Sequence, residues 1–189
     1  MNDAFIRGMQ EQLGMGEALG RALSFRAELR SSEVEESPSP PLANPDHSIL
    51  LAAHQLGVPL TVHAALGAEI IHQHPAANGA AIGDTSHRDF RRLAASLGQI
   101  DDGGVVLNLG SAVIMPEVFL KALTIARNLE AGKPKNFVTV DLDMQRHYRP
   151  RMNVVQRPTL DGGRGYEITG HHEIMVPLLV WSLLERLRS

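Results

Sequence analysis

Residues 105–117 read VVLNLGSAVIMPE, an apolar run followed by a Gly-Ser turn and the start of a helix. The run Val105–Leu109 predicts a buried strand, too apolar for the edge of a sheet. Pro116 suits a first helical turn, because its missing N–H would have no partner there. Further apolar runs at 58–63 and 137–142 predict two more strands, separated by helical segments. This alternation predicts an α/β fold, a mainly parallel sheet with helices on both faces.

The region before these strands has a different composition. Residues 2–29 predict one long helix, because apolar side chains recur in a broken 3.6-residue stripe. Four glycines weaken it, by about 1 kcal/mol each relative to Ala; they are Gly8, Gly14, Gly16 and Gly20. Two interpretations are open: a helix held only by tertiary contacts, or a glycine face that a neighbouring helix approaches closely. Residues 31–45 are rich in Ser, Pro and Glu and predict a mobile surface loop.

Residues 46–189 then complete a single α/β domain that spans 1–189. The further helices expected in this core run from Asp46 or His47 to Gly57, from an N-cap at 84–86 to Gly98, from Pro116 to Leu129, and over 172–188. The remaining segments are a long loop at 64–84, a basic irregular loop at 143–165 and a short extended stretch at 166–169.

The composition limits the class of protein. The 189 residues are 43% hydrophobic and 21% charged, which suffices for the core of one domain. The absence of Cys excludes thiol catalysis, disulfide scaffolds and thiolate zinc sites. A net charge of −3 gives no basic surface for nucleic acid. With no apolar run of membrane-spanning length and no signal-peptide pattern, we expect a cytoplasmic protein with a small-molecule ligand.

Polar residues follow each expected strand. They are His63, then Gly110 and Ser111, then Asp141, Asp143 and a basic run at 146–151. In an open parallel sheet, ligands bind outside the carboxyl ends of the strands, so the fold would bring these residues to one edge. Gly110 and Ser111 precede a helix whose free N–H groups suit a phosphate, with a plain tight turn as the alternative. Asp141 or Asp143 would then accept hydrogen bonds from ribose hydroxyls.

The basic run supplies a second candidate subsite, made of Arg146, Tyr148, Arg149 and Arg151. Guanidinium groups bind carboxylate or phosphate through paired hydrogen bonds, so this run predicts a site for an anionic ligand. A solvated loop or a subunit contact is the alternative. Because imidazole titrates near neutral pH, His63, His147 and His171 are the candidates for acid–base catalysis.

Two histidine pairs raise the question of a metal site. His72 and His74 are separated by one residue, and His171 and His172 precede Glu173. Imidazoles and carboxylates bind transition metals, which would permit a metal-dependent hydrolase. Neither spacing is that of a specific metal motif: His171 and His172 point to opposite sides of a strand, and a helix keeps neither pair on one face. Helix capping or polar hydrogen bonding is the plainer interpretation, so we assign no metal ligands.

With this layout, the chain resembles the deoxyhypusine synthase-like family over residues 46–188. The resemblance lies in the order of segments that match the family, namely 57–60 (GVPL), 105–113 (VVLNLGSAV), 137–141 (FVTVD) and 174–179 (IMVPLL). It implies a Rossmann-like fold, NAD binding at the turn after 105–109, and a homo-oligomer. It also implies a transferase that carries an aminobutyl group as an imine on a lysine.

The chain departs from that family where its chemistry resides. The segment 154–169, where the family has its catalytic lysine, contains no Lys, and Gly110 alone remains of a glycine triplet. Lys121 is the nearest amine. We therefore expect a nucleotide-binding relative that does not make deoxyhypusine. A non-catalytic oligomeric scaffold and a hydrolase with His-bound metal are the alternatives. The last helix, apolar over much of its surface, predicts a dimer or tetramer.

Overall fold

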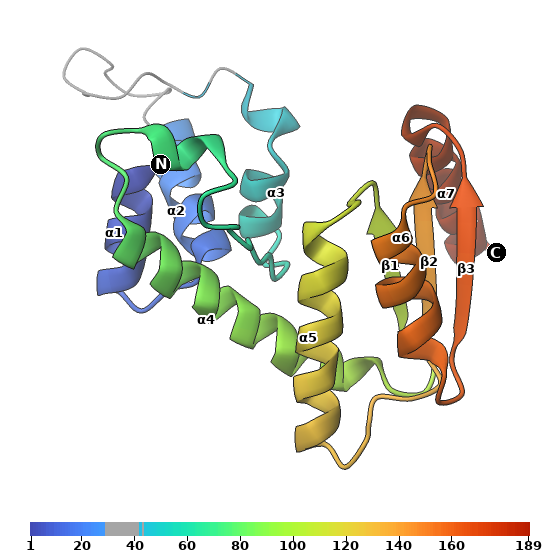
Figure 1. Ribbon diagram of the computed structural model, residues 1–189. Helices are drawn as coiled ribbons and strands as arrows, with labels where there is room; N and C mark the ends of the chain where they lie inside the picture. Colours follow the sequence, from blue (N-terminus) through green and yellow to red (C-terminus); the bar gives the residue numbers. More distant parts are fainter. Residues whose placement is uncertain (29–41, 43) are drawn as a thin grey trace. The chain divides into compact units, whose positions relative to one another are not determined.

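The computed structural model describes residues 1–28, 42 and 44–189, so most of the loop expected at 31–45 lies outside the described residues. We expected one domain over 1–189, and the chain forms two compact units, Met1–Leu93 and Ala94–Ser189. Figure 1 shows helices in the first unit and a small sheet with helices in the second. Among the helices of the described ranges, none has the length and apolar character needed to cross a membrane.

Unit 1 is helical, with a core that includes Phe5, Met15 and Ile82. Its α-helices are α1 (Asn2–Gln10), α2 (Met15–Glu28), α3 (Ile49–Gln55) and α4 (Gly79–Leu97), the last of which continues into unit 2. Short 3-10 turns occupy η1 (Pro45–His47) and η2 (Ile70–Gln73). The single helix predicted over 2–29 is wrong. The chain turns between α1 and α2, where Gln12 adopts a φ of +59°.

The glycines of this region permit close packing. A Cβ on Gly14 would collide with the carboxylate of Asp89, and one on Gly16 would collide with the carbonyl oxygen of Leu60. Any larger residue would therefore push α2 away from α4 and from the segment after α3. Gly14 thus lies close to the helix α4, but Gly16 lies against the non-helical segment at Leu60, so the glycines do not form one face toward a single neighbouring helix.

The strand predicted over 58–63 is wrong, because these residues form no ladder with another strand. Two side chains of α4 instead accept from backbone groups of this segment and of the residue after it. The N–H of Val62 donates to Asp89 at 2.8 Å, and that of Ala64 donates to Ser86 at 2.9 Å. The N-cap predicted at 84–86 is also wrong. The helix begins at Gly79, and the Asn78 side chain accepts a hydrogen bond from Ala81 N–H.

Unit 2 is built on a three-stranded parallel sheet in the order β1 (Val105–Leu109), β2 (Val138–Asp143), β3 (Arg164–Thr169). A short turn, η3 (Gly98–Ile100), precedes β1, and α5 (Ile114–Leu129) connects β1 to β2. The predicted mixed α/β class with a parallel sheet is confirmed. Within the described residues β1 is an edge strand, so the expectation that this run is too apolar for an edge is wrong.

The basic loop predicted over 143–165 is largely helical. It contains α6 (Tyr148–Pro150), a π-helical stretch η4 (Arg151–Gln156) and a 3-10 turn η5 (Arg157–Thr159). Buried Val154 and Val155 lie on η4, which packs on α5, β2 and β3. These two apolar side chains fix the segment against the sheet. The expected last helix is present as α7 (His172–Arg188).

Candidate functional site

The carboxyl ends of the three strands meet at one edge of the unit 2 sheet. Past β1, the N–H of Gly110 donates to the carbonyl oxygen of Leu142 at 3.1 Å. Past β3, the N–H of Gly170 donates to the carbonyl oxygen of Asp143 at 3.1 Å. These bonds hold the segments after all three strands side by side, in the place where parallel sheets bind ligands.

Three polar side chains form a row across the sheet. Asn108, Asp141 and Glu167 are direct partners in the register of the neighbouring strands, so all three lie on the same face. Asn108 donates through Nδ2 to Asp141 Oδ1 at 2.7 Å. Asp141 is 3% exposed, and Asn108 is also buried. We call these three residues the polar row.

The polar row has more acceptors than donors. Burial raises the pKa of Asp141, the amide of Asn108 opposes this, and the nearby charges of Asp143 and Glu167 raise it further. Oxygen Oε1 of Glu167 is buried without a hydrogen-bond donor among the described residues. A buried oxygen without a donor lowers the stability of the fold unless another molecule supplies the hydrogen bond.

Asp143 and His147 lie beyond the polar row, at the end of β2. Asp143 Oδ1 accepts from the N–H of Met144 at 2.6 Å, and its Oδ2 lies 4.0 Å from His147 Nε2. Arg146 turns to β3, where its Nε donates to Thr169 Oγ1 at 3.3 Å. The edge therefore combines a carboxylate, an imidazole and a guanidinium, as the sequence predicts for this segment.

The turn at Gly110 is shaped by the protein itself. Gly110 has a φ of +70°, and a Cβ there would come to 3.1 Å from the ring of His172. The His172 ring nitrogen Nε2 in turn lies 3.1 Å from the carbonyl oxygen of Leu142, to which it donates. The Ser111 hydroxyl accepts from Met115 N–H at 3.3 Å, in the first turn of α5. These contacts account for the Gly-Ser turn structurally and leave its role toward phosphate a prediction.

The basic run does not form one cluster. Arg149 Nε lies 3.4 Å from Glu117 Oε1, while Tyr148 and Arg151 are exposed. Glu117 also accepts from Lys121 Nζ at 2.8 Å and from Asn153 Nδ2 at 2.8 Å. The charge of Arg149 is therefore met inside unit 2, and Arg146 is the member of the run that lies at the strand ends.

His63 belongs to unit 1 and, because 58–63 is no strand, the sheet does not bring it to the carboxyl edge. Its Nε2 lies 3.0 Å from Thr61 Oγ1. Burial lowers the pKa of His63, while the nearby charge of Asp89 opposes that change. His171 is the N-cap residue of α7, and its backbone carbonyl accepts from Met175 N–H.

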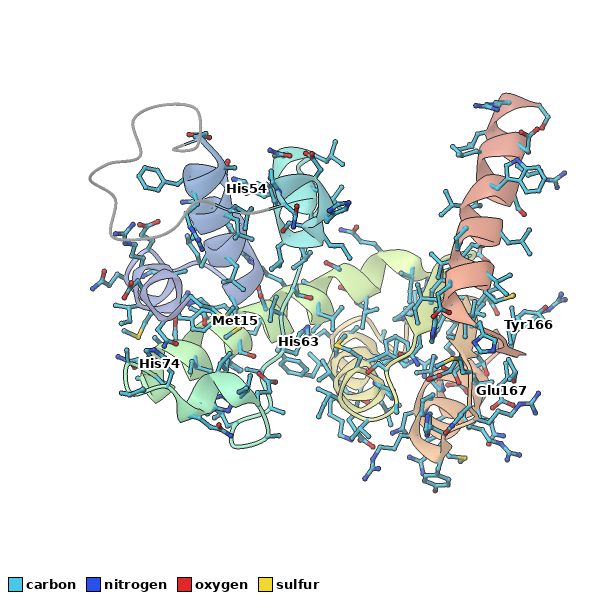
Figure 2. The ribbon with its side chains drawn as sticks, turned by 90° about the horizontal axis from the view of Figure 1, so that it is seen from above. Met15, His54, His63, His74, Tyr166 and Glu167 are labelled. Atoms are coloured by element: carbon cyan, nitrogen blue, oxygen red, sulfur yellow. The ribbon has the colours of Figure 1, made fainter. Side chains whose placement is uncertain are left out.

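The histidine pairs make local hydrogen bonds. His72 Nδ1 accepts from Gly67 N–H at 3.2 Å, and His74 Nδ1 accepts from Ala76 N–H at 3.1 Å. His63 and His74 are labelled in Figure 2. In the part of the chain that the structure describes, no three His, Cys, Asp or Glu side chains are grouped to hold a metal ion.

Sequence reasoning missed Asn108 and Glu167. The signal for Asn108 is a single amide inside the apolar run Val105–Leu109. Glu167 lies in a short strand of mixed composition, and its place beside Asp141 follows from the register of β2 and β3, which no local pattern gives.

Comparison with known proteins gives no relative. No protein-family description, no curated protein and no solved structure matches this chain.

Proposed function

We propose that unit 2, a Rossmann-like domain of a cytoplasmic deoxyhypusine synthase-like protein, binds NAD or a related nucleotide at its carboxyl edge. The observation that supports this proposal is the polar row, with Asp143 beside it. Ribose hydroxyls would donate to Asp143 and, where binding exposes it, to the unpaired oxygen of Glu167, which is buried in the free chain. Arg146 would contact an anionic second ligand, and His147 would transfer protons.

A diol fits this edge better than a phosphate does. The polar row and Asp143 present carboxylate oxygens, which accept hydrogen bonds and repel anions. Hydroxyl groups donate hydrogen bonds and carry no charge. They would therefore supply the donors that the buried oxygens of the row lack. The phosphates would then lie toward Gly110 and Arg146, on the positive N-terminal side of α5.

Deoxyhypusine synthesis is not part of this proposal. An imine carrier requires a neutral lysine amine, and 136–189 contain no Lys. Lys121 forms a 2.8 Å ion pair with Glu117, whose pKa it lowers against the effect of burial. That ion pair holds the Lys121 side chain against Glu117. We expect no aminobutyl transfer from spermidine to a lysine-bearing acceptor protein.

The test is calorimetric titration of the full chain with NAD, with adenosine and with inorganic phosphate. We expect NAD and adenosine to bind and phosphate alone to bind far more weakly. Asp143→Asn should weaken NAD binding about tenfold, because one charged acceptor of a hydroxyl is lost. The matched control is Asp161→Asn, an exposed carboxylate before β3, which should bind like the wild type. Equal binding by both variants would refute the proposal.

A further inference from the structure

Helix α7 carries large apolar side chains that the other described residues of unit 2 leave exposed. None of its residues, all of which the structure describes, is buried. Trp181 is 63% exposed and Leu187 is 84% exposed. Residues 174–184 contain no charged side chain, and the charges of α7 lie at its two ends. A helix that is apolar on most of its sides belongs in the interior of an assembly.

The two outer strands of the unit 2 sheet expose apolar side chains on one face, while Leu142 of the central strand β2, on the same face, is 3% exposed. Strand alternation places Val105, Leu107 and Leu109 on the face opposite the polar row, together with Tyr166 and Ile168. These five side chains are 39–58% exposed. Figure 2 shows α7 leading away from the sheet and labels Tyr166 beside Glu167, its neighbour on the other face. We call the five residues the open face.

We infer that a second copy of this chain covers the open face with its α7, and that the exchange is reciprocal. Helix α7 and the open face are the two surfaces that a helix packed on a sheet would bury. In unit 2 they are not packed on each other. A two-fold axis pairs each half with its complement in the other copy. The dimensions agree, because a 17-residue helix is about 25 Å long and strands of five or six residues are about 17–20 Å long.

The apolar area meets what a stable dimer requires. Such an interface takes about 800 Å² from each partner. Trp181 offers on the order of 100 Å², because an aromatic side chain has about 150–250 Å² to bury. With the exposed Leu, Ile and Val side chains of α7 and the open face, one copy offers on the order of 1,000 Å². The occupant that matches both surfaces at once is a second copy.

Light scattering of the full chain at micromolar concentration tests the dimer. We expect twice the mass of one chain. Trp181→Glu and Leu184→Glu should each weaken the dimer roughly 30-fold or more, since they place a charge in the apolar contact. The control is Leu129→Glu, at the end of α5, where the leucine is 79% exposed and outside both surfaces. A monomeric wild type, including one that binds lipid vesicles, would overturn the inference.

Cross-linking tests the exchange itself and does not depend on disruptive variants. The chain has no Cys, so introduced thiols have no competitors. A mixture of Leu107→Cys chains and Trp181→Cys chains should form the mixed disulfide on oxidation, because it joins α7 of one copy to β1 of the other. Cross-links confined to Trp181→Cys pairs would show helices packed on each other and refute the exchange. A disulfide within one chain that carries both substitutions would refute it as well.

Discussion

Each unit of this protein buries one aspartate, and the two differ in what they contact. Asp89 of unit 1 is fully buried, and its Oδ2 accepts from the N–H groups of Gly16 and Val62, each at 2.8 Å. Asp141 of unit 2 accepts from the Asn108 side chain and faces the carboxylates of Asp143 and Glu167. Burial raises the pKa of both aspartates.

This difference indicates that the carboxylate of Asp89 has a structural role and that the carboxylate of Asp141 belongs to a candidate binding site. The donors to Asp89 are backbone groups of two segments that it joins to α4, and Arg92 Nη1 lies 4.0 Å from its Oδ1. Asp89 therefore holds unit 1 together. Asp143, beside Asp141, accepts from the N–H of Met144, but no donor among the described residues reaches Glu167 Oε1, so we infer that the value of this oxygen lies in what it binds.

The largest expected effect is that of Asp89→Ala. This change leaves two backbone N–H groups without their acceptor, which costs roughly 2–5 kcal/mol of unfolding free energy. Guanidinium unfolding followed by far-UV circular dichroism measures it. Asp89→Asn keeps an acceptor oxygen and should lose less. If Asp89→Ala unfolds at the wild-type midpoint, Asp89 does not hold the segments of unit 1 together. The contrast drawn between Asp89 and Asp141 would then be wrong.

Gly14→Ala should destabilise unit 1 by roughly 1–3 kcal/mol, because the new Cβ would overlap the Asp89 carboxylate. The matched control is Gly83→Ala in α4, where a Cβ meets no atom within 4 Å. That control should be neutral or stabilising by up to about 1 kcal/mol, since Ala favours helices. The same unfolding experiment compares the pair. Equal stability of the two variants would mean that Gly14 is not needed for close packing.

Asp141→Asn should stabilise unit 2 at pH 7 by a few degrees in melting temperature, roughly the effect of 1 kcal/mol. The raised pKa of Asp141 means that its contribution to stability is present below its unfolded value of 3.8 and is lost as the pH rises through its folded value. Asparagine at position 141 does not ionise, so the variant keeps this stability as the pH rises. Its side-chain oxygen still accepts a hydrogen bond from Asn108.

Melting curves between pH 3 and pH 8 measure this difference. We expect the advantage of Asp141→Asn to vanish in acid, where the wild-type carboxyl is protonated. A variant that melts below the wild type at pH 7 would show that the charge of Asp141 stabilises the fold, as a structural ion pair would.

The parts of the fold that follow from sequence are those decided by local apolar runs. The runs at 105–109 and 138–142 become strands, and 172–188 becomes a helix. The run at 58–63 has the same pattern but forms no ladder. Asp89, more than twenty residues later, takes the N–H of Val62, and Ser86 takes that of Ala64 just after the run. Local patterns contain no information about such partners.

The candidate site shows the same limit. Asp141 and Asp143 lie near the carboxyl end of a recognisable strand, and Arg146 and His147 follow it, so the sequence predicts their place at the carboxyl edge. Glu167 joins them because β3 pairs with β2 in one register, and that register depends on the helical turns between the two strands. Val154 and Val155 pack those turns on the sheet. They lie between Arg151 and Arg157 in the sequence, where no apolar run marks them.

Titration of NAD into the wild type, Glu167→Gln and Asp161→Asn tests most directly whether the polar row is a binding site. Glu167→Gln replaces the half-buried carboxylate, whose Oε1 has no donor among the described residues, with a neutral amide of the same size. We predict that the wild type and Asp161→Asn bind NAD equally, and that Glu167→Gln binds at least about tenfold more weakly while melting no lower than the wild type. Wild-type affinity in Glu167→Gln, or no binding of NAD by the wild type, would contradict a nucleotide site at the polar row.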